Sequence, residues 1–324
     1  MASSILTPRL AFKPFKYQWA YEYWFKQQNA HWLHTEINMQ KDLKDWLEEL
    51  SNAEKNVIGN ILKGFAQTET HVEDYWTQYV THWFPIPEIK MMATAFGNME
   101  TIHATAYSYL NDTLGLDDFQ AFMSDTATMN KLDVLINVNN NDSSIEHIGR
   151  SIALFSACAE GIQLFSSFAV LLSFRKKNLL TGIGQQMIFS IRDESLHSEA
   201  GCKLFRTLIE ENSGIFTESF KKSIYEGVDL ALQLEFNYID KIFELGDLES
   251  ITKSQLKTFM HDRANRKLQE LLLSPAYTVD NALIQEMEWF YLMVSGEQQT
   301  DFFANRETGY AKPNDDWNNI EDLF

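Results

Sequence analysis

The chain has 324 residues, of which 45% are hydrophobic and 13% aromatic, and this is enough apolar material for one large core. Only 14 glycines and 6 prolines occur, which favours long helices over a sandwich or barrel. The formal charge of −18 argues against a nucleic-acid partner, because the nucleic-acid backbone is itself anionic. Two cysteines, Cys158 and Cys202, make no disulfide framework and indicate a cytoplasmic location. Residues 1–10 hold no apolar stretch of secretory length, so we expect no signal peptide.

The first half of the chain predicts two long helices after an aromatic segment. Residues 14–50 are expected to be irregular to helical. Ser51 and Glu54 have the spacing of a capping box, which predicts a helix that starts there and runs through Val72. Two prolines at 85 and 87 mark its end. A second helix is predicted over residues 88–110, and Gly115 opens the connection that follows.

The second half predicts further helices and then a tail. Residues 125–150 indicate a helical piece followed by a polar loop at 139–144. Helices are then predicted over residues 151–174, 183–212, 217–245, 254–273 and 279–295. No alternation typical of strands occurs. We expect residues 1–298 to form one helical domain and residues 299–324 to form a flexible tail, whose apolar end is either a docking peptide or a frayed terminus.

The segment 151–174 is long and apolar enough to suggest a membrane span. Its one charged residue is Glu160, and Arg150 and Arg175 flank it. A carboxylate near the middle of a lipid-facing helix is costly, whereas the central helix of a large bundle is also apolar on all sides. We therefore predict a buried core helix and no membrane partner.

Two of the eight histidines have a glutamate three residues before them, in Glu100-Thr-Ile-His103 and Glu194-Ser-Leu-His197. Positions i and i+3 share one face of a helix, so each pair can offer an oxygen and a nitrogen to the same ion. Another glutamate precedes each pair on the preceding predicted helix. Glu69 lies 31 residues before Glu100, and Glu160 lies 34 residues before Glu194.

This repeated set matches the arrangement of ferritin-like di-iron and di-manganese proteins, in which two helices give one Glu each and two give Glu-x-x-His. Charge supports the match, because a buried and unpaired Glu160 carboxylate would be prohibitively costly, whereas four carboxylates balance two divalent cations. Oxygen and imidazole donors suit iron or manganese better than structural zinc. The fold class predicted is therefore an all-α, ferritin-like helical bundle with a dinuclear metal site. The alternative is a protonated core glutamate with structural histidines.

Beyond these residues, the chain resembles the small, radical-generating subunit of class I ribonucleotide reductase. The stretches that carry the resemblance span residues 17 to about 200 and occur in the family's order. They are Ala30-His-Trp-Leu-His-Thr-Glu-Ile37, Met99-Glu-Thr-Ile-His-Ala-Thr-Ala-Tyr107, Ala159-Glu-Gly-Ile162 and Ser190-Ile-Arg-Asp-Glu-Ser-Leu-His197.

The resemblance implies roles for single residues. The metal ligands it implies are Glu69, Glu100, His103, Glu160, Glu194 and His197. Tyr107 matches the tyrosine that carries a stable radical in many members. Trp32, His103 and Asp193 match the chain through which the radical leaves the metal site, and Glu36 matches an acidic position near that exit. Tyr310 in the tail would relay the radical to the large subunit.

Three positions depart from the pattern that many members of this family share. Glu69 stands where many di-iron members have aspartate and resembles members that use manganese or mixed metals. Leu164 and Ser190 stand where many members place a bulky aromatic and an aliphatic residue around the radical tyrosine. A di-iron cofactor with a Tyr107 radical is favoured, and a di-manganese or manganese–iron cluster that is itself the radical source is the alternative.

The expected function is therefore that of a ribonucleoside-diphosphate reductase small subunit. It would be active only with a large catalytic subunit, docked by the tail that ends at Phe324, and a homodimer is expected from the resemblance. The rival enzyme is a ferritin-like dimetal oxidase or oxygenase with its own small substrate. The rival binding protein is a ferritin-like metal store or peroxide scavenger, which would form a cage.

Overall fold

Helices make up the regular structure of the residues that the computed structural model describes, which are 4–116 and 142–295, apart from the side chains of residues 66, 67 and 70; no strand occurs among them. In chain order the elements are α1 (Gln18–Asn29), η1 (His34–Glu36), α2 (Gln40–Glu48), α3 (Asn52–Asp74), η2 (Tyr75–Val80), α4 (Thr81–Trp83), α5 (Pro87–Leu114), α8 (Ile145–Leu154), η3 (Phe155–Gln163), α9 (Phe165–Ser173), η4 (Phe174–Lys177), α10 (Thr181–Glu211), η5 (Ser213–Ile215), α11 (Glu218–Ile242), α12 (Lys253–Glu270) and α13 (Asn281–Glu286). The all-helical prediction is confirmed.

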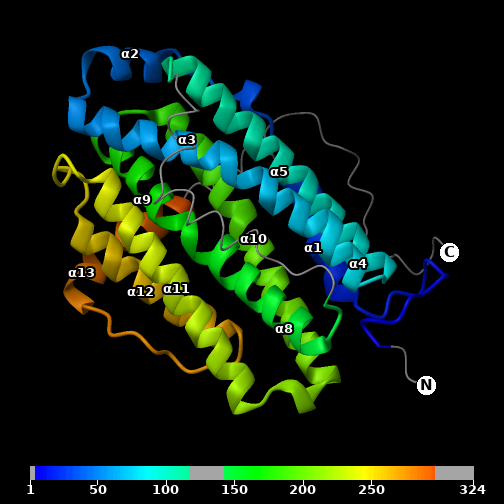
Figure 1. The fold of residues 1–324 in the computed structure, drawn as a ribbon. Helices are drawn as coiled ribbons and strands as arrows, with labels where there is room; N and C mark the ends of the chain where they lie inside the picture. Colours follow the sequence, from blue (N-terminus) through cyan, green and yellow to red (C-terminus); the bar gives the residue numbers. More distant parts are fainter. Residues whose placement is uncertain (1–3, 117–141, 296–324) are drawn as a thin grey trace.

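The long helices pack side by side along a common direction, so that helices far apart in the sequence share one core (Figure 1). The pair α3 and α5 lies on one side of the molecule, the chain from α8 to α9 lies with α10 in the middle, and α11 and α12 cover the other side. Helix α1 packs along α5, and α2 reaches the start of α10. Most of the buried apolar side chains of these helices form one hydrophobic core, and Met99, Ile102 and Ala106 of α5 form a smaller cluster with Trp32.

The two long helices of the first half begin and end close to the predicted positions. Ser51 Oγ accepts a hydrogen bond from the backbone N–H of Glu54, and the Glu54 carboxylate accepts one from Ser51 N at 2.8 Å, which completes the capping box. Helix α3 continues through the π-helical η2 before the prolines. Helix α5 ends at Gly115, whose φ of 66° is a left-handed conformation that favours glycine.

The most apolar helix is longer than predicted. It runs continuously over Ile145–Lys177, whereas the sequence predicted residues 151–174. The six residues before 151 join it because Ser144 caps the helix by accepting from His147 N. It is long and apolar enough to cross a membrane, but 94% of its most apolar window is buried inside the protein. It is therefore the core helix that the sequence predicted.

The other boundaries differ by a few residues, and two predictions lie outside the described residues. The predicted helix over 279–295 is interrupted at Met287, where α13 ends before a second helical stretch begins at 288. The helical piece predicted from residue 125 falls largely within 117–141, outside the described part. The tail 299–324, with Tyr310, also lies outside it.

Helix α10 depends on α2 for its first turn. Asp42 accepts hydrogen bonds from the backbone N–H groups of Gly182 and Ile183 at 3.0 and 2.7 Å, and Asp45 accepts from Leu180 N at 3.0 Å. These carboxylates satisfy donors that no residue within α10 can satisfy. A side chain at Gly182 would collide with Met39 and Asp42, so this close approach requires glycine.

Candidate metal centre

Four helical segments bring the six predicted ligand residues to one level of the bundle. Glu69 comes from α3, Glu100 and His103 from α5, Glu160 from η3, and Glu194 and His197 from α10. All six side chains are fully buried. The i, i+3 spacing places each glutamate and its histidine on the inward face of the same helix, as the sequence indicated.

Their ligand atoms form two overlapping groups of four. One group contains Glu69, Glu100, His103 and Glu194, and the other contains Glu100, Glu160, Glu194 and His197. Within each group, one ligand atom from every residue lies within 4.8 Å of the others. Glu100 and Glu194 belong to both groups, so each can give one carboxylate oxygen to each of two neighbouring ions.

Several of these atoms have no hydrogen-bond partner although they are buried. They are both carboxylate oxygens of Glu69 and of Glu194, one oxygen each of Glu100 and Glu160, and Nδ1 of His197. His197 Nδ1 lies 2.7 Å from Glu100 Oε1, yet this pair has no hydrogen-bond alignment. Buried polar atoms are nearly always satisfied, so this inward-facing set fits cations as its missing partners.

The protonation behaviour of the carboxyl groups reflects the same crowding. Burial, reinforced by Glu100, raises the pKa of Glu69 well above its usual value. Burial and the neighbouring Glu194 do the same to the pKa of Glu160. The pKa of Glu194 is raised to about 8 by burial and then by Glu100. For Glu100, burial acts upward, but the two histidines outweigh it and lower its pKa to about 2. Without cations, the site therefore favours the protonated forms of Glu69, Glu160 and Glu194.

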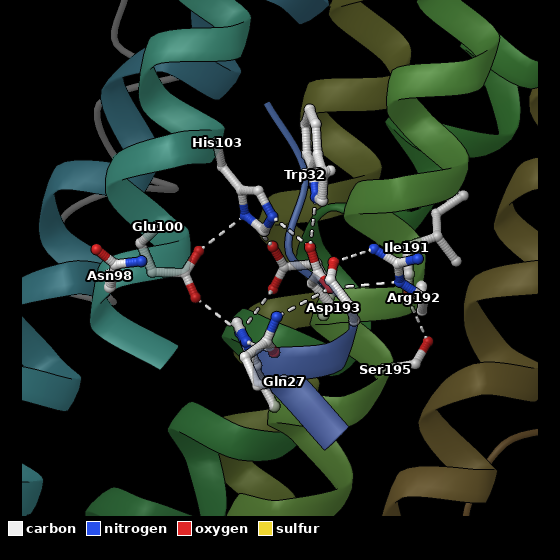
Figure 2. Close-up of polar contacts among 12 residues, drawn as sticks. Gln27, Trp32, Asn98, Glu100, His103, Ile191, Arg192, Asp193 and Ser195 are labelled. Carbon is white, nitrogen blue, oxygen red and sulfur yellow. Dashed lines mark hydrogen bonds and ion pairs between the residues drawn. The ribbon is translucent and has the colours of Figure 1, made fainter. Parts of the chain in front are cut away.

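The outer nitrogens of the two histidines are held by two further residues. His103 Nε2 lies 3.1 Å from Asp193 Oδ2, and His197 Nε2 lies 3.0 Å from the amide oxygen of Gln27. Gln27 also donates to Asp193 Oδ1 at 3.2 Å. Such partners fix the orientation of a ligating imidazole. Figure 2 shows Gln27 and His103 converging on Asp193.

Trp32 contacts the same aspartate and packs against α5. Its indole Nε1 donates to Asp193 Oδ2 at 2.8 Å, and its ring centroid lies 5.8 Å from that of His103 (Figure 2). Trp32 is 2% exposed although it lies in the short link between α1 and η1. Glu36 is exposed, and its carboxylate accepts from Leu33 N at 2.9 Å, which fixes the turn that follows Trp32.

Tyr107 lies one helical turn beyond His103 in a dry, aromatic pocket. Its ring centroid is 6.2 Å from His103 and 4.8 Å from Phe65. The hydroxyl is buried and has no hydrogen-bond partner, and Ser190 Oγ is in the same state. Burial, and then Glu69, raises the pKa of Tyr107 well above its usual value, while Ser190 acts weakly in the opposite direction. Leu164 is also buried.

Two residues of this site were missed by the sequence analysis. Gln27 lies in the aromatic segment that gave no clear pattern. Trp76 donates from Nε1 to Glu160 Oε1 at 2.6 Å, and it lies in the π-helical η2, where helical spacing does not hold. Neither residue belongs to a motif, and both contacts join distant parts of the chain.

The family model of the ribonucleotide reductase small chain matches residues 9–283. The chain belongs to this family. It is similar to the probable ribonucleoside-diphosphate reductase small subunit 048L of Invertebrate iridescent virus 3, with 34% identity over 95% of this chain and 86% of that protein. Membership makes it the small subunit of a ribonucleotide reductase, an oxidoreductase component, and confirms the function predicted from the sequence.

Two solved structures share the fold at lower sequence identity. The dimanganese(II)-NrdF of Streptococcus sanguinis superposes with a TM-score of 0.74 and 19% identity, over 86% of this chain and 99% of that one. The Rnr4 homodimer of Saccharomyces cerevisiae gives a TM-score of 0.73 and 21% identity, over 86% and 87%. These likenesses confirm the ferritin-like helical bundle. The buried group of acidic residues and histidines on this fold is able to bind metal.

Proposed function

We propose that the six buried side chains hold two metal ions, with Glu100 and Glu194 bridging them. Glu69 and His103 would complete one position, and Glu160 and His197 the other. The support is the pair of four-residue groups that share two carboxylates, together with the unpartnered atoms that face inward. Four carboxylates balance two divalent cations, which offsets the cost of burying them.

We propose iron at both positions, with a di-manganese or manganese–iron pair as the alternative. Oxygen and imidazole donors suit all three pairs. Burial raises the pKa of the Cys158 thiol to about 12, so this neighbour of Glu160 stays protonated and is a poor ligand. Glu69 supports the alternative, because the sequence resemblance associates glutamate there with manganese-using members. Metal analysis of protein from its native source distinguishes the three.

When bound, the metal pair would supply one-electron oxidising power after reacting with dioxygen or a reduced oxygen species. Tyr107 would store that oxidising equivalent as a tyrosyl radical. Its pocket suits this role, because the hydroxyl is fully buried and the neighbouring ring is Phe65. The Tyr107 phenol keeps its proton in the resting state, since its pKa is raised.

The path outward would run through His103, Asp193 and Trp32. Asp193 accepts from both neighbours, so it can hold the proton that moves with an electron between the indole and the imidazole. From Trp32 the oxidising equivalent would pass to Tyr310 in the tail 299–324, and then to a large subunit where ribonucleotides are reduced. We also propose that the tail docks this subunit, that the chain forms a homodimer and that it acts in the cytoplasm.

This proposal rests on the carboxylates of Glu100 and Glu194, which belong to both groups of ligands. A measurement of the radical tests it. The purified chain is loaded anaerobically with Fe(II) and exposed to dioxygen, and electron paramagnetic resonance then detects the tyrosyl signal. Tyr107→Phe should abolish the signal, whereas Tyr109→Phe should keep it, because the partly buried Tyr109 packs against His34, with ring centroids 4.9 Å apart, and its ring contacts neither of the proposed histidine ligands in the described part of the chain. If nucleotide reduction persists in Tyr107→Phe, the metal cluster rather than Tyr107 is the radical source. Failure to bind metal would overturn the proposal.

A further inference from the structure

A second indole, that of Trp76, contacts the candidate metal centre. Trp76 is fully buried, its Nε1 donates to Glu160 Oε1 at 2.6 Å, and its ring centroid lies 6.2 Å from that of His197. Trp32 is linked to the His103 position of the site, whereas Trp76 contacts Glu160 and His197 of the other position. Each of the two groups of four therefore has its own tryptophan.

Oxidisable rings continue from Trp76 toward the surface. The ring centroid of Tyr75 lies 6.5 Å from Trp76, and Tyr75 lies 5.7 Å from Tyr79 and 6.1 Å from Trp83. Tyr79 and Trp83 are 5.8 Å apart. Together with Gln78 and His82, these last two rings line a surface hollow of about 210 Å³. Tyr79 is half-buried there, whereas Tyr75 is 2% exposed.

The oxidisable rings form a row, which consists of Trp76, Tyr75, Tyr79 and Trp83. This row differs in composition from the phenylalanines beside it. Two phenylalanines pack beside it without extending it: Phe155 stacks on Tyr75 at 3.6 Å, and Phe96 lies 5.0 Å from Trp76. Phenylalanine is far harder to oxidise than tyrosine or tryptophan. The Tyr75 hydroxyl also has its own partner, Ser151 Oγ at 2.9 Å. Ring packing alone explains the close contacts, but it requires neither an indole bonded to Glu160 nor a row that ends at the surface.

We propose that Trp76, Tyr75, and the pair Tyr79 and Trp83 form an inward path for single electrons, from a one-electron donor such as a reduced flavin to the metal centre. This inference rests on the proposed function. Reduction of one dioxygen to two waters takes four electrons and four protons. Two ions that pass from the +2 to the +3 state give two electrons, and Tyr107 gives a third with its phenolic proton. The fourth must come from outside the site.

The row would deliver that electron without lasting change to itself. Trp76 gives one electron to the site and is reduced again by Tyr75. Tyr75 is then restored from Tyr79 or Trp83, and the external donor restores them in turn. When the Tyr75 ring is oxidised, the hydroxyl of the partly exposed Ser151 takes up the phenolic proton and passes its own proton to solvent, and the transfer reverses when the ring is reduced. The net result is one electron transferred from the donor to the site, with no bond of the row broken.

The test is the rate at which the site of the Fe(II)-loaded chain takes up the fourth electron from photoreduced flavin mononucleotide while it reacts with dioxygen, followed by stopped-flow absorbance and by the radical signal of the site. Tyr75→Phe removes only the hydroxyl and keeps the ring that packs on Phe155. It should slow reduction by about tenfold, a barrier increase of about 1.4 kcal/mol, at unchanged metal content and helicity. Trp289→Phe, a tryptophan away from the row, is the matched control and should react like the wild type.

The double variant Tyr79→Phe, Trp83→Phe cuts the row at the surface and should also be slow, so the test does not depend on one substitution. A reduction rate in Tyr75→Phe and in the double variant that equals the wild-type rate would overturn the inference. A reduction rate that falls only in Trp32→Phe would also overturn it, because the electrons would then enter through Trp32, along the proposed outward path. If the wild-type chain binds no metal, the proposed function is wrong as well as the inference. If the chain binds metal but the variants react like the wild type, only the inference is wrong.

Discussion

The indole nitrogen of Trp32 and the carboxylate of Asp193, 161 positions apart in the chain, are joined by a 2.8 Å hydrogen bond in the fully buried interior. The same carboxylate oxygen lies 3.1 Å from His103 Nε2. Burial acts to raise the pKa of Asp193, but the hydrogen bond from His103 and the charges of His103, Arg192 and His197 together outweigh it, so the pKa is lowered and the group stays ionised. Asp193 is thus an acceptor shared by a tryptophan and a proposed ligand.

Asp193→Asn should therefore disconnect Trp32 from His103 more than it disturbs the fold. The indole and the imidazole both bond to Oδ2, and Gln27 donates to Oδ1, so an amide at this position puts its NH2 group, which cannot accept, against at least one of these donors and also removes the negative charge. We expect nucleotide reduction with the large subunit to fall by about 10- to 100-fold, with most bound metal retained. Asp262→Asn, at the surface of α12, is the matched control. Full activity in Asp193→Asn would contradict the proposed path.

Metal binding should stabilise the chain strongly. Metal ions that bind only the folded state raise the free energy of unfolding. Mn(II) at about 100 times its dissociation constant raises it by about 2.7 kcal/mol per site. Calorimetry with Mn(II) and with a chelator measures the shift of the unfolding midpoint. Glu194→Gln should lose most of the shift, because Glu194 belongs to both groups, while Glu210→Gln on the exposed face of the same helix should keep it. An equal shift in both variants would disprove the ligand assignment.

Ser190→Ala should lengthen the life of the proposed Tyr107 radical. The Ser190 hydroxyl is buried beside the Tyr107 phenol and acts to lower the pKa of Tyr107, in the direction of a hydrogen-bond donor. Removing this proton donor leaves the pocket drier. The decay of the electron paramagnetic resonance signal at constant temperature gives the lifetime, with Ser195→Ala on the outer side of α10 as the control. A lifetime that is unchanged or shorter would show that Ser190 does not limit the radical.

Acid should loosen the attachment of the N-terminal segment at Glu211. This carboxylate accepts from Tyr17 OH at 2.6 Å and from Ile5 N at 2.7 Å, and it pairs with Lys16 at 2.9 Å. Burial acts to raise its pKa, but these three contacts outweigh it and lower the pKa below 4.5. A carboxyl whose pKa is lowered by folding stabilises the protein above its unfolded pKa, and that contribution disappears as the pH falls through the folded value.

Glu211→Gln should therefore lower the free energy of unfolding by an amount that depends on pH. The variant should be less stable than the wild type at pH 7, and the difference should shrink below about pH 4.5. Urea unfolding at a series of pH values measures it, and Glu210→Gln is again the neighbouring control. A difference that stays constant from pH 7 to pH 3 would contradict this account.

Much of the fold was predictable because its signals are local. The capping box at Ser51, the helix end at Gly115 and the two Glu-x-x-His pairs each involve residues within one or two helical turns. Glu69 and Glu160 lie 31 and 34 residues before Glu100 and Glu194, and this similar spacing depends only on the lengths of the helices. The family stretches then indicated Trp32, Asp193 and Tyr107, and the structure brings all three beside the proposed ligands.

What could not be predicted depends on contacts across the chain. Gln27 reaches His197 over 170 positions, and nothing in its own segment marks it. Trp76 faces Glu160 because η2 is π-helical, and a pattern with a period of 3.6 residues gives a different face for it. The helix start at Ile145 was missed because the cap at Ser144 lies inside a polar stretch that predicts a loop equally well.

The attachment of α2 to the start of α10 has a consequence for how the protein is made. The Asp42 carboxylate can find Gly182 and Ile183 only after some 140 further residues have been synthesised. Until then the segment that bears Trp32 has neither its Asp193 partner nor its anchor at α10. The N-terminal 50 residues can pack on α5 earlier, but their contacts with α10 must wait until that helix has been synthesised, and contacts of such long sequence separation form slowly. The proposed radical path through Trp32 and Asp193 is therefore completed late in folding.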